Sequence, residues 1–322
     1  MSFFARLYQK FPKGNRDSKI FLYFCGAKEN LMRFKYLIAS LMLCFSLSVF
    51  TQQKRAFLVG ISHYDTALTG YQWNNINGVN DIELLSPILL NQGFQIVRLL
   101  DEEATYEAIT KQLSQFIKKS KAGDIVYLHF STHGQPVEDL DGDEPDGWDE
   151  AIVPIDAYKQ YRKGLYEGEC HLLDDKLNTY IKQLRSRLGA KGFLYVTIDA
   201  CHAGTSSRSN DDIIRGTRVG FTSRDKVFKP NKDKRSHYQL QHSNKMSDVV
   251  FFEACRADQV NTEIKIDGQR YGALSYHLAN AIQKESISKH PSNLLSTLKT
   301  EILQQGKWPN NQNLVIESSV QR

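Results

Sequence analysis

The sequence predicts an α/β protein: a three-layer αβα sandwich built on a mostly parallel, six-stranded sheet. The first observation is alternation, because short apolar runs typical of buried strands are separated by amphipathic segments long enough for crossover helices. The second is composition. The chain has 322 residues, 41% of them hydrophobic and 24% charged, which is enough to bury a sizeable core.

The part of the chain from residue 55 to residue 130 predicts three strands and two helices. Gly93 follows the first helix as its stop, and Thr105 is a suitable N-cap for the second. The predicted strands are Arg55–Ser62, Phe94–Leu100 and Asp124–Phe130, and the predicted helices are Val79–Asn91 and Thr105–Lys119.

The rest of the chain continues the alternation after a long gap. We expect strands at Phe193–Ile198, Val249–Glu253 and Asn313–Ile316, and helices at Leu173–Leu188, Tyr271–Gln283 and Asn293–Gln305. Between them, Thr205–Ser247 is polar and rich in Lys, Arg, Ser and Asn, which predicts a long loop. Parallel sheets gather their chemistry at the carboxyl ends of their strands, so these ends are where a site is expected.

The N-terminal 51 residues differ from the rest. Residues 1–35 carry a formal charge of +6 and residues 36–51 carry none, so residues 52–322 have a net charge of −1 although the whole chain has +5. The basic character therefore belongs to this leader, and a nucleic-acid partner is not expected.

The uncharged run Tyr36–Phe50 has the length of a signal-peptide core and is short for a membrane span. We expect export after cleavage near Thr51, with no stable membrane span. An uncleaved anchor formed by residues 36–50 and a buried helix are the alternatives. Met32 is a second candidate start.

Two predicted strands end in residues that carry chemistry. The strand ending at Phe130 runs into Ser131–Gly134, which includes His133, and the strand ending at Ile198 runs into Asp199–Gly204, which includes Cys201. An imidazole beside a thiol can hold the thiolate or pass its proton to a leaving group. A buried structural cysteine and a turn-capping histidine are the alternative for such a pair.

These segments resemble the caspase-like cysteine peptidases, and specifically the metacaspases. The resemblance rests on HG after one strand, DACHAG after the next, the acidic DGDEPDGWDEAIVPID, and EACRADQ followed by YGAL, and it covers most of residues 55–283. It implies the caspase-haemoglobinase-like fold, with residues 52–204 as the larger region, 205–247 as a linker and 248–322 as the smaller region of the same domain. It also implies that Cys201 is the nucleophile, that His133 is the general acid or base, and that the amides of Cys201 and Gly134 form the oxyanion hole. His202, although adjacent to Cys201, is expected to point elsewhere.

Asp81 and Asp199 match the acids that line the family's pocket for a basic side chain. Because carboxylates pair with Arg or Lys and repel Asp, the resemblance implies cleavage after Arg or Lys. Without the resemblance, the two acids are a helix first-turn residue and a hydrogen-bond acceptor at a strand end.

The acidic stretch after His133 is either a solvated surface loop or part of a calcium site. By resemblance to calcium-activated metacaspases, the matching ligands are Asp149, Asp174 and Asp175. A further acid shortly after the nucleophile is absent from TSSRSN, so the fourth ligand has no obvious match.

The sequence therefore predicts a cysteine endopeptidase that cleaves protein or peptide substrates after Arg or Lys, as a monomer and without an organic cofactor. The 205–247 loop is either a surface insertion or a place of self-cleavage, with Arg208, Arg215, Arg218, Arg224 and Lys234 among its basic residues. A catalytically silent peptide-binding module and a Cys/His hydrolase or transferase of non-peptide acyl groups are the alternatives.

Overall fold

A computed structural model describes residues 52–64, 73–142, 144, 146–201, 212–229, 240 and 242–320. The expected leader at 1–51, with its apolar run 36–50, lies outside the described residues, as do His202 and parts of the 205–247 loop. No helix in the described ranges combines the length and apolarity needed to cross a bilayer.

A six-stranded sheet forms the centre of the fold, in the order β11-β8-β7-β3-β1-β2. Every neighbouring pair is parallel except β11 with β8, so the predicted mostly parallel sheet is confirmed. The strands are β1 (Lys54–Gly60), β2 (Phe94–Leu100), β3 (Ile125–Ser131), β7 (Phe193–Asp199), β8 (Asp248–Glu253) and β11 (Val315–Ser318).

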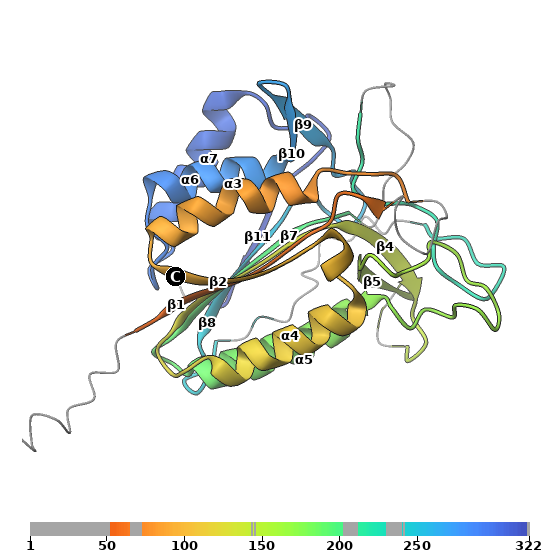
Figure 1. The fold of residues 1–322 in the computed structure, drawn as a ribbon, viewed down its shortest axis with the longest axis horizontal. Coiled ribbons are helices and arrows are strands. Elements are labelled where there is room, and N and C mark those ends of the chain that lie inside the picture. The colour runs from red at the N-terminus through yellow and green to blue at the C-terminus, as the bar shows by residue number, and fades with distance from the viewer. Residues whose placement is uncertain are drawn as a thin grey trace, which may run out of the picture. The chain divides into compact units, whose positions relative to one another are not determined.

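Helices cover both faces of this sheet, which completes the three predicted layers (Figure 1). One face carries α3 (Gly78–Asn91), α6 (Ala273–Lys284) and α7 (Ser292–Gln305), and the other carries α4 (Tyr106–Lys119) and α5 (Asp174–Leu188), while a short 3₁₀ turn η2 (Asp101–Glu103) precedes α4.

The alternation of side chains along the strands explains this layering. On β1, Ala56 and Leu58 pack with the α3 and α6 side, whereas Phe57 and Val59 pack with the α4 and α5 side. All four side chains are fully buried, because a strand in the middle of a covered sheet has no solvent face.

Two small antiparallel sheets were not predicted from the sequence. One consists of β4 (His133–Glu138), β5 (Trp148–Val153) and β6 (Leu172–Leu173), and the other is a hairpin of β9 (Glu263–Ile266) and β10 (Gln269–Gly272). As a result, Asp149 lies in a strand and not in a surface loop, and the start of the predicted helix at Tyr271 is wrong, because Tyr271 belongs to β10.

The hairpin had a sequence signal. Asp267 and Gly268 connect its strands with φ of 47° and 88°, the left-handed conformation that a two-residue Asp-Gly turn favours. An Asp-Gly pair between two short runs of alternating apolar and polar residues predicts this turn. The second strand of the hairpin, β10, ends directly before α6.

Candidate active site

The two predicted chemical segments leave neighbouring strands at the same edge of the sheet. Ser131 at the end of β3 is paired with Asp199 at the end of β7, and His133 and Cys201 each follow two residues later. The parallel register therefore brings together residues that are far apart in the chain.

His133 is buried in an aromatic setting. Its ring stacks on Trp73, with centroids 4.9 Å apart, and lies 4.8 Å from the ring of Tyr64. Its Nε2 lies 2.7 Å from the carbonyl oxygen of Asn74, which can only accept, so Nε2 carries the hydrogen and Nδ1 presents a lone pair. Burial lowers the pKa of His133 to about 3, and Nδ1 has no hydrogen-bond partner among the described residues. The ring is therefore neutral, with an available lone pair on Nδ1.

Cys201 follows β7 and is 1% exposed. Its thiol donates to the carbonyl oxygen of Gln259 at 2.9 Å, and Cys255 donates to the same oxygen at 3.7 Å. The hydrogen-bond interaction of its thiol with Cys201, and next its burial, raise the pKa of Cys255 well above its usual range. Cys255 therefore stays a neutral thiol.

The backbone amides of Cys201 and Gly134 meet at one oxygen. Cys201 N–H donates to the carbonyl of Arg215 at 2.9 Å, and Gly134 N–H donates to the same carbonyl at 3.3 Å. Two amides on one carbonyl oxygen are the arrangement of an oxyanion hole. The residues involved are those that the sequence analysis assigned to it.

The side chain of Arg215 fills a fully buried acidic pocket. Its Nη1 lies 2.6 Å from Asp81 Oδ2 and 3.6 Å from Asp199 Oδ1, and it donates to Ser131 Oγ at 2.6 Å. Both aspartates were expected here from the family resemblance, whereas Arg215 was expected only as one of the basic residues of the 205–247 loop.

A third carboxylate was missed. Glu263 on β9 lies 2.9 Å from Nη2 and 3.1 Å from Nε of Arg215. The smaller region contains several scattered acidic residues, and no sequence motif distinguishes Glu263 from the others. Recognising the Asp267–Gly268 hairpin would have placed Glu263 at the start of a strand.

The charges of this pocket perturb one another. Burial raises the pKa of Asp81 to about 7, against the lowering effect of Arg215. Burial also acts on Asp199, but Arg215 and the hydrogen bonds from Asn261 and Ser275 hold its pKa below the usual value. The pKa of Arg215 is raised, because its three carboxylates outweigh its burial.

The backbone around Arg215 lies as an extended strand across the site. Arg215 N–H donates to the carbonyl of Asn261 at 3.0 Å, and Gly216 forms bridges to Gly134 on one side and to Cys201 on the other. Further along, Phe221 pairs with β4 through Pro136 and Glu138. An added Cβ on Gly216 would lie 1.8 Å from the carbonyl oxygen of Cys201, so only glycine fits there. This part of the 205–247 loop is therefore held in the site.

The predicted calcium ligands lie on β5 and at the start of α5. Asp149 and Asp174 are 6% and 8% exposed, and Asp174 Oδ1 accepts from the amide of Glu150 at 3.3 Å. Across the described part of the chain, no three His, Cys, Asp or Glu side chains are arranged to share a metal ion.

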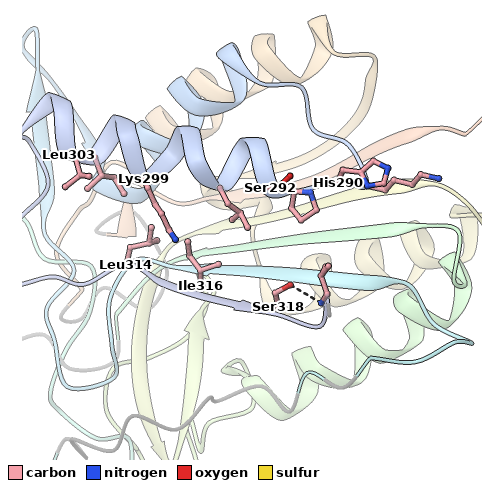
Figure 2. A pocket seen from close by; sticks show the side chains of 12 residues that line it. His290, Ser292, Lys299, Leu303, Leu314, Ile316 and Ser318 are labelled. Carbon is pink, nitrogen blue, oxygen red and sulfur yellow. Dashed lines mark hydrogen bonds between the residues drawn. The ribbon is translucent and has the colours of Figure 1, made fainter. Parts of the chain in front are cut away.

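A separate cavity of about 920 Å³ lies between α7 and β11 (Figure 2). Apolar side chains such as Leu303, Leu314 and Ile316 line it together with Lys299 and His290. None of its lining residues belongs to the site of His133 and Cys201.

Comparisons with known proteins place the fold and the sequence in the same class. Solved structures with this fold include a Geobacter sulfurreducens protein, with a TM-score of 0.56 and 19% identity, covering 83% of this chain and 93% of its own. Caspase-1 from Spodoptera frugiperda has a TM-score of 0.51 at 13% identity, covering 84% and 88%. The fold is that of caspase-like peptidases.

Curated relatives by sequence are metacaspases. Metacaspase-1A of Aspergillus niger is 24% identical over 80% of this chain and 69% of its own, and metacaspase-1B of Neosartorya fischeri is 27% identical over 74% and 64%. The alignments thus span about two thirds of these relatives. The caspase-domain model of the C14 peptidases matches residues 53–319. The chain belongs to this family of caspase-like cysteine peptidases.

Proposed function

We propose that this protein is a cysteine endopeptidase that hydrolyses peptide bonds after Arg or Lys, with Cys201 as nucleophile and His133 as its proton-transfer partner. One observation carries the proposal. Arg215 lies in the site as the residue before a cut bond would, with its carbonyl on two amides and its side chain among three carboxylates.

The chemistry follows from these positions. Nδ1 of His133 accepts the thiol proton of Cys201, and the sulfur attacks the carbonyl carbon while the amides of Cys201 and Gly134 stabilise the negative charge on its oxygen. His133 then returns the proton to the leaving amine, which gives a thioester. Water hydrolyses the thioester and restores the thiol.

The Asn74 carbonyl has a positioning role in this scheme. By accepting from Nε2 it keeps the Nδ1 lone pair available, and Trp73 and Tyr64 hold the plane of the ring. The Cys201 thiol has to leave the Gln259 carbonyl before it transfers its proton.

We also propose that the peptide bond between Arg215 and Gly216 is the first bond that the enzyme cleaves. Because this segment occupies both the pocket and the oxyanion hole, the uncut chain blocks its own site. Cutting the bond frees the backbone of residue 216 and allows the segment to withdraw.

The test uses the 52–322 chain beside its Cys201→Ala variant. Wild type is expected to yield a fragment beginning at Gly216, detected by mass spectrometry, and to release fluorophore from peptides ending in Arg or Lys. The variant is expected to do neither. Turnover by Cys201→Ala at the wild-type rate would reject the nucleophile, and cleavage only after Asp would reject the pocket.

The silent-module alternative has its own outcome in the same experiment. An intact wild-type chain that binds Arg peptides but never cuts them, and whose Cys201 is not labelled by a thiol-directed probe, would replace the peptidase proposal with that binding function.

We also propose that calcium stimulates the enzyme and that the mature chain is exported. The grounds for calcium are the buried carboxylates Asp149 and Asp174 beside Asp175. The grounds for export are the basic stretch and apolar run before residue 52. Fractionation of cells that carry the full chain tests export: a mature form found only in the cytoplasm would reject it.

A further inference from the structure

We infer that Glu263 makes the pocket selective for arginine over lysine, an inference that rests on the proposed peptidase function and specifies its substrate. The three carboxylates do not contact the same part of the Arg215 side chain. Asp81 and Asp199 lie at Nη1, whereas Glu263 lies at Nε and Nη2.

This division matters because the two basic side chains differ in shape. A guanidinium presents donors along a planar fork, so one edge meets Glu263 while Nη1 reaches Asp81 and Ser131. A lysine has a single Nζ and only methylene groups where arginine has Nε. With Nζ at Asp81, the Glu263 carboxylate would lose the hydrogen bond from Nε and the ion-pair contact with Nη2 of Arg215.

The position of Glu263 is fixed by its surroundings. Its carboxylate accepts from the backbone amide of Asn77 at 2.7 Å and from Asn77 Nδ2 at 2.6 Å. The residue is 5% exposed, and its own amide donates to the carbonyl of Ile213 at 2.9 Å. A carboxylate held in this way cannot swing to follow a shorter or straighter side chain.

Burial makes the missing contacts costly. Hydrogen bonds to buried charged groups contribute enough to change a rate by about ten-fold to a hundred-fold. We therefore expect wild type to have a kcat/KM at least about ten-fold higher for an Arg peptide than for the Lys peptide of the same sequence.

The experiment measures both peptides with wild type, Glu263→Gln and the matched control Asp81→Asn. Glu263→Gln is expected to lower kcat/KM for the Arg peptide about ten-fold while changing the Lys peptide by less than about three-fold. Asp81→Asn is expected to impair both peptides, because Nη1 and Nζ share that partner.

Failures of the two proposals are distinguishable. If wild type cuts neither peptide, the proposed function fails. If it cuts both and the Arg-to-Lys ratio is the same in Glu263→Gln, or if wild type prefers Lys, the selectivity inference is overturned.

A second measurement does not depend on the folding of the Glu263 variant. Arg215→Lys in the otherwise wild-type chain is expected to slow the appearance of the fragment beginning at Gly216 by about ten-fold. Equal rates for Arg215 and Lys at this position would overturn the inference.

Discussion

Arg215 is the residue on which the site depends. Its guanidinium is fully buried with Asp81, Asp199 and Glu263, so one positive charge faces three carboxyl groups. A buried excess of negative charge is relieved most simply by a proton. The raised pKa of Asp81 indicates where that proton is held.

The pH dependence of cleavage is expected to follow this carboxyl group. Its pKa is about 7 with Arg215 in the pocket and is higher in the empty pocket, where the lowering effect of Arg215 is missing. Raising the pH from 6 to 8 ionises a larger fraction of this carboxyl group in the free enzyme and strengthens its attraction for the basic side chain. kcat/KM for an Arg peptide is expected to rise over this interval in steady-state assays.

Asp81→Asn serves as the control, because an amide does not titrate. Its profile is expected to lose the rise between pH 6 and 8. A wild-type profile that is flat between pH 6 and 8, or one that falls, would contradict the assigned role of Asp81.

Two elements outside the central sheet carry buried carboxylates. The β9–β10 hairpin carries Glu263 into the pocket, and its closure before α6 puts Gly272 against Asp81, whose Oδ1 accepts from the Gly272 amide at 3.0 Å. A Cβ on Gly272 would lie 2.2 Å from Asp199 Oδ2, so the pocket wall requires glycine there.

The second element is β5 with the start of α5, where acids gather. Burial, followed by the charge of Glu144, raises the pKa of Glu150 to about 8, and burial, followed by the charge of Glu150, raises that of Asp174 to about 7. The folded chain therefore holds protons here that the unfolded chain releases near pH 4.5 and below.

The free energy of unfolding is expected to fall as the pH rises from about 5 to about 8, because both groups must ionise in the folded state. Thermal melts of Cys201→Ala at the two pH values measure this. Glu150→Gln is expected to flatten the dependence, and a higher Tm at pH 8 than at pH 5 would contradict it.

The same melts test calcium. If the cation binds these carboxylates, calcium chloride raises Tm at pH 8 and has little effect at pH 5, where the acids are protonated. The effect is expected to be lost in Asp174→Asn, and no shift at pH 8 would reject calcium binding.

In the whole molecule, the site consists of segments from most of the chain. Asn77 and Asp81 come from the start of α3, Ser131 and His133 from the β3–β4 junction, and Asp199 and Cys201 from the end of β7. The 212–221 segment joins them from the linker, so the site is complete only when the two regions fold together.

The docked position of the 212–221 segment predicts which of its neighbouring arginines an added protease can reach. In folded Cys201→Ala, trypsin is expected to cut after Arg224, whose side chain is 69% exposed, and not after Arg215, which is fully buried. Mass spectrometry of early fragments measures this, with heat-unfolded protein as the control. An early fragment ending at Arg215 would contradict the docked position.

The sequence by itself predicted the layered sheet and several residues of the site, because these depend on local patterns. Alternating apolar runs and crossover helices predict a parallel sheet, and parallel strands carry His133, Cys201 and Asp199 to one edge. Asp81 and Gly134 came from the resemblance, and the structure places both in the site.

Only the tertiary structure decided what fills the site. Which of the loop's basic residues enters the pocket depends on pairing between Arg215, Asn261 and Gly134, segments far apart in the chain. Glu263 becomes part of the site only through the same long-range pairing. Periodicity and motif spacing describe neighbours along the chain, whereas a buried charge is balanced by whichever groups the fold brings within a few ångströms.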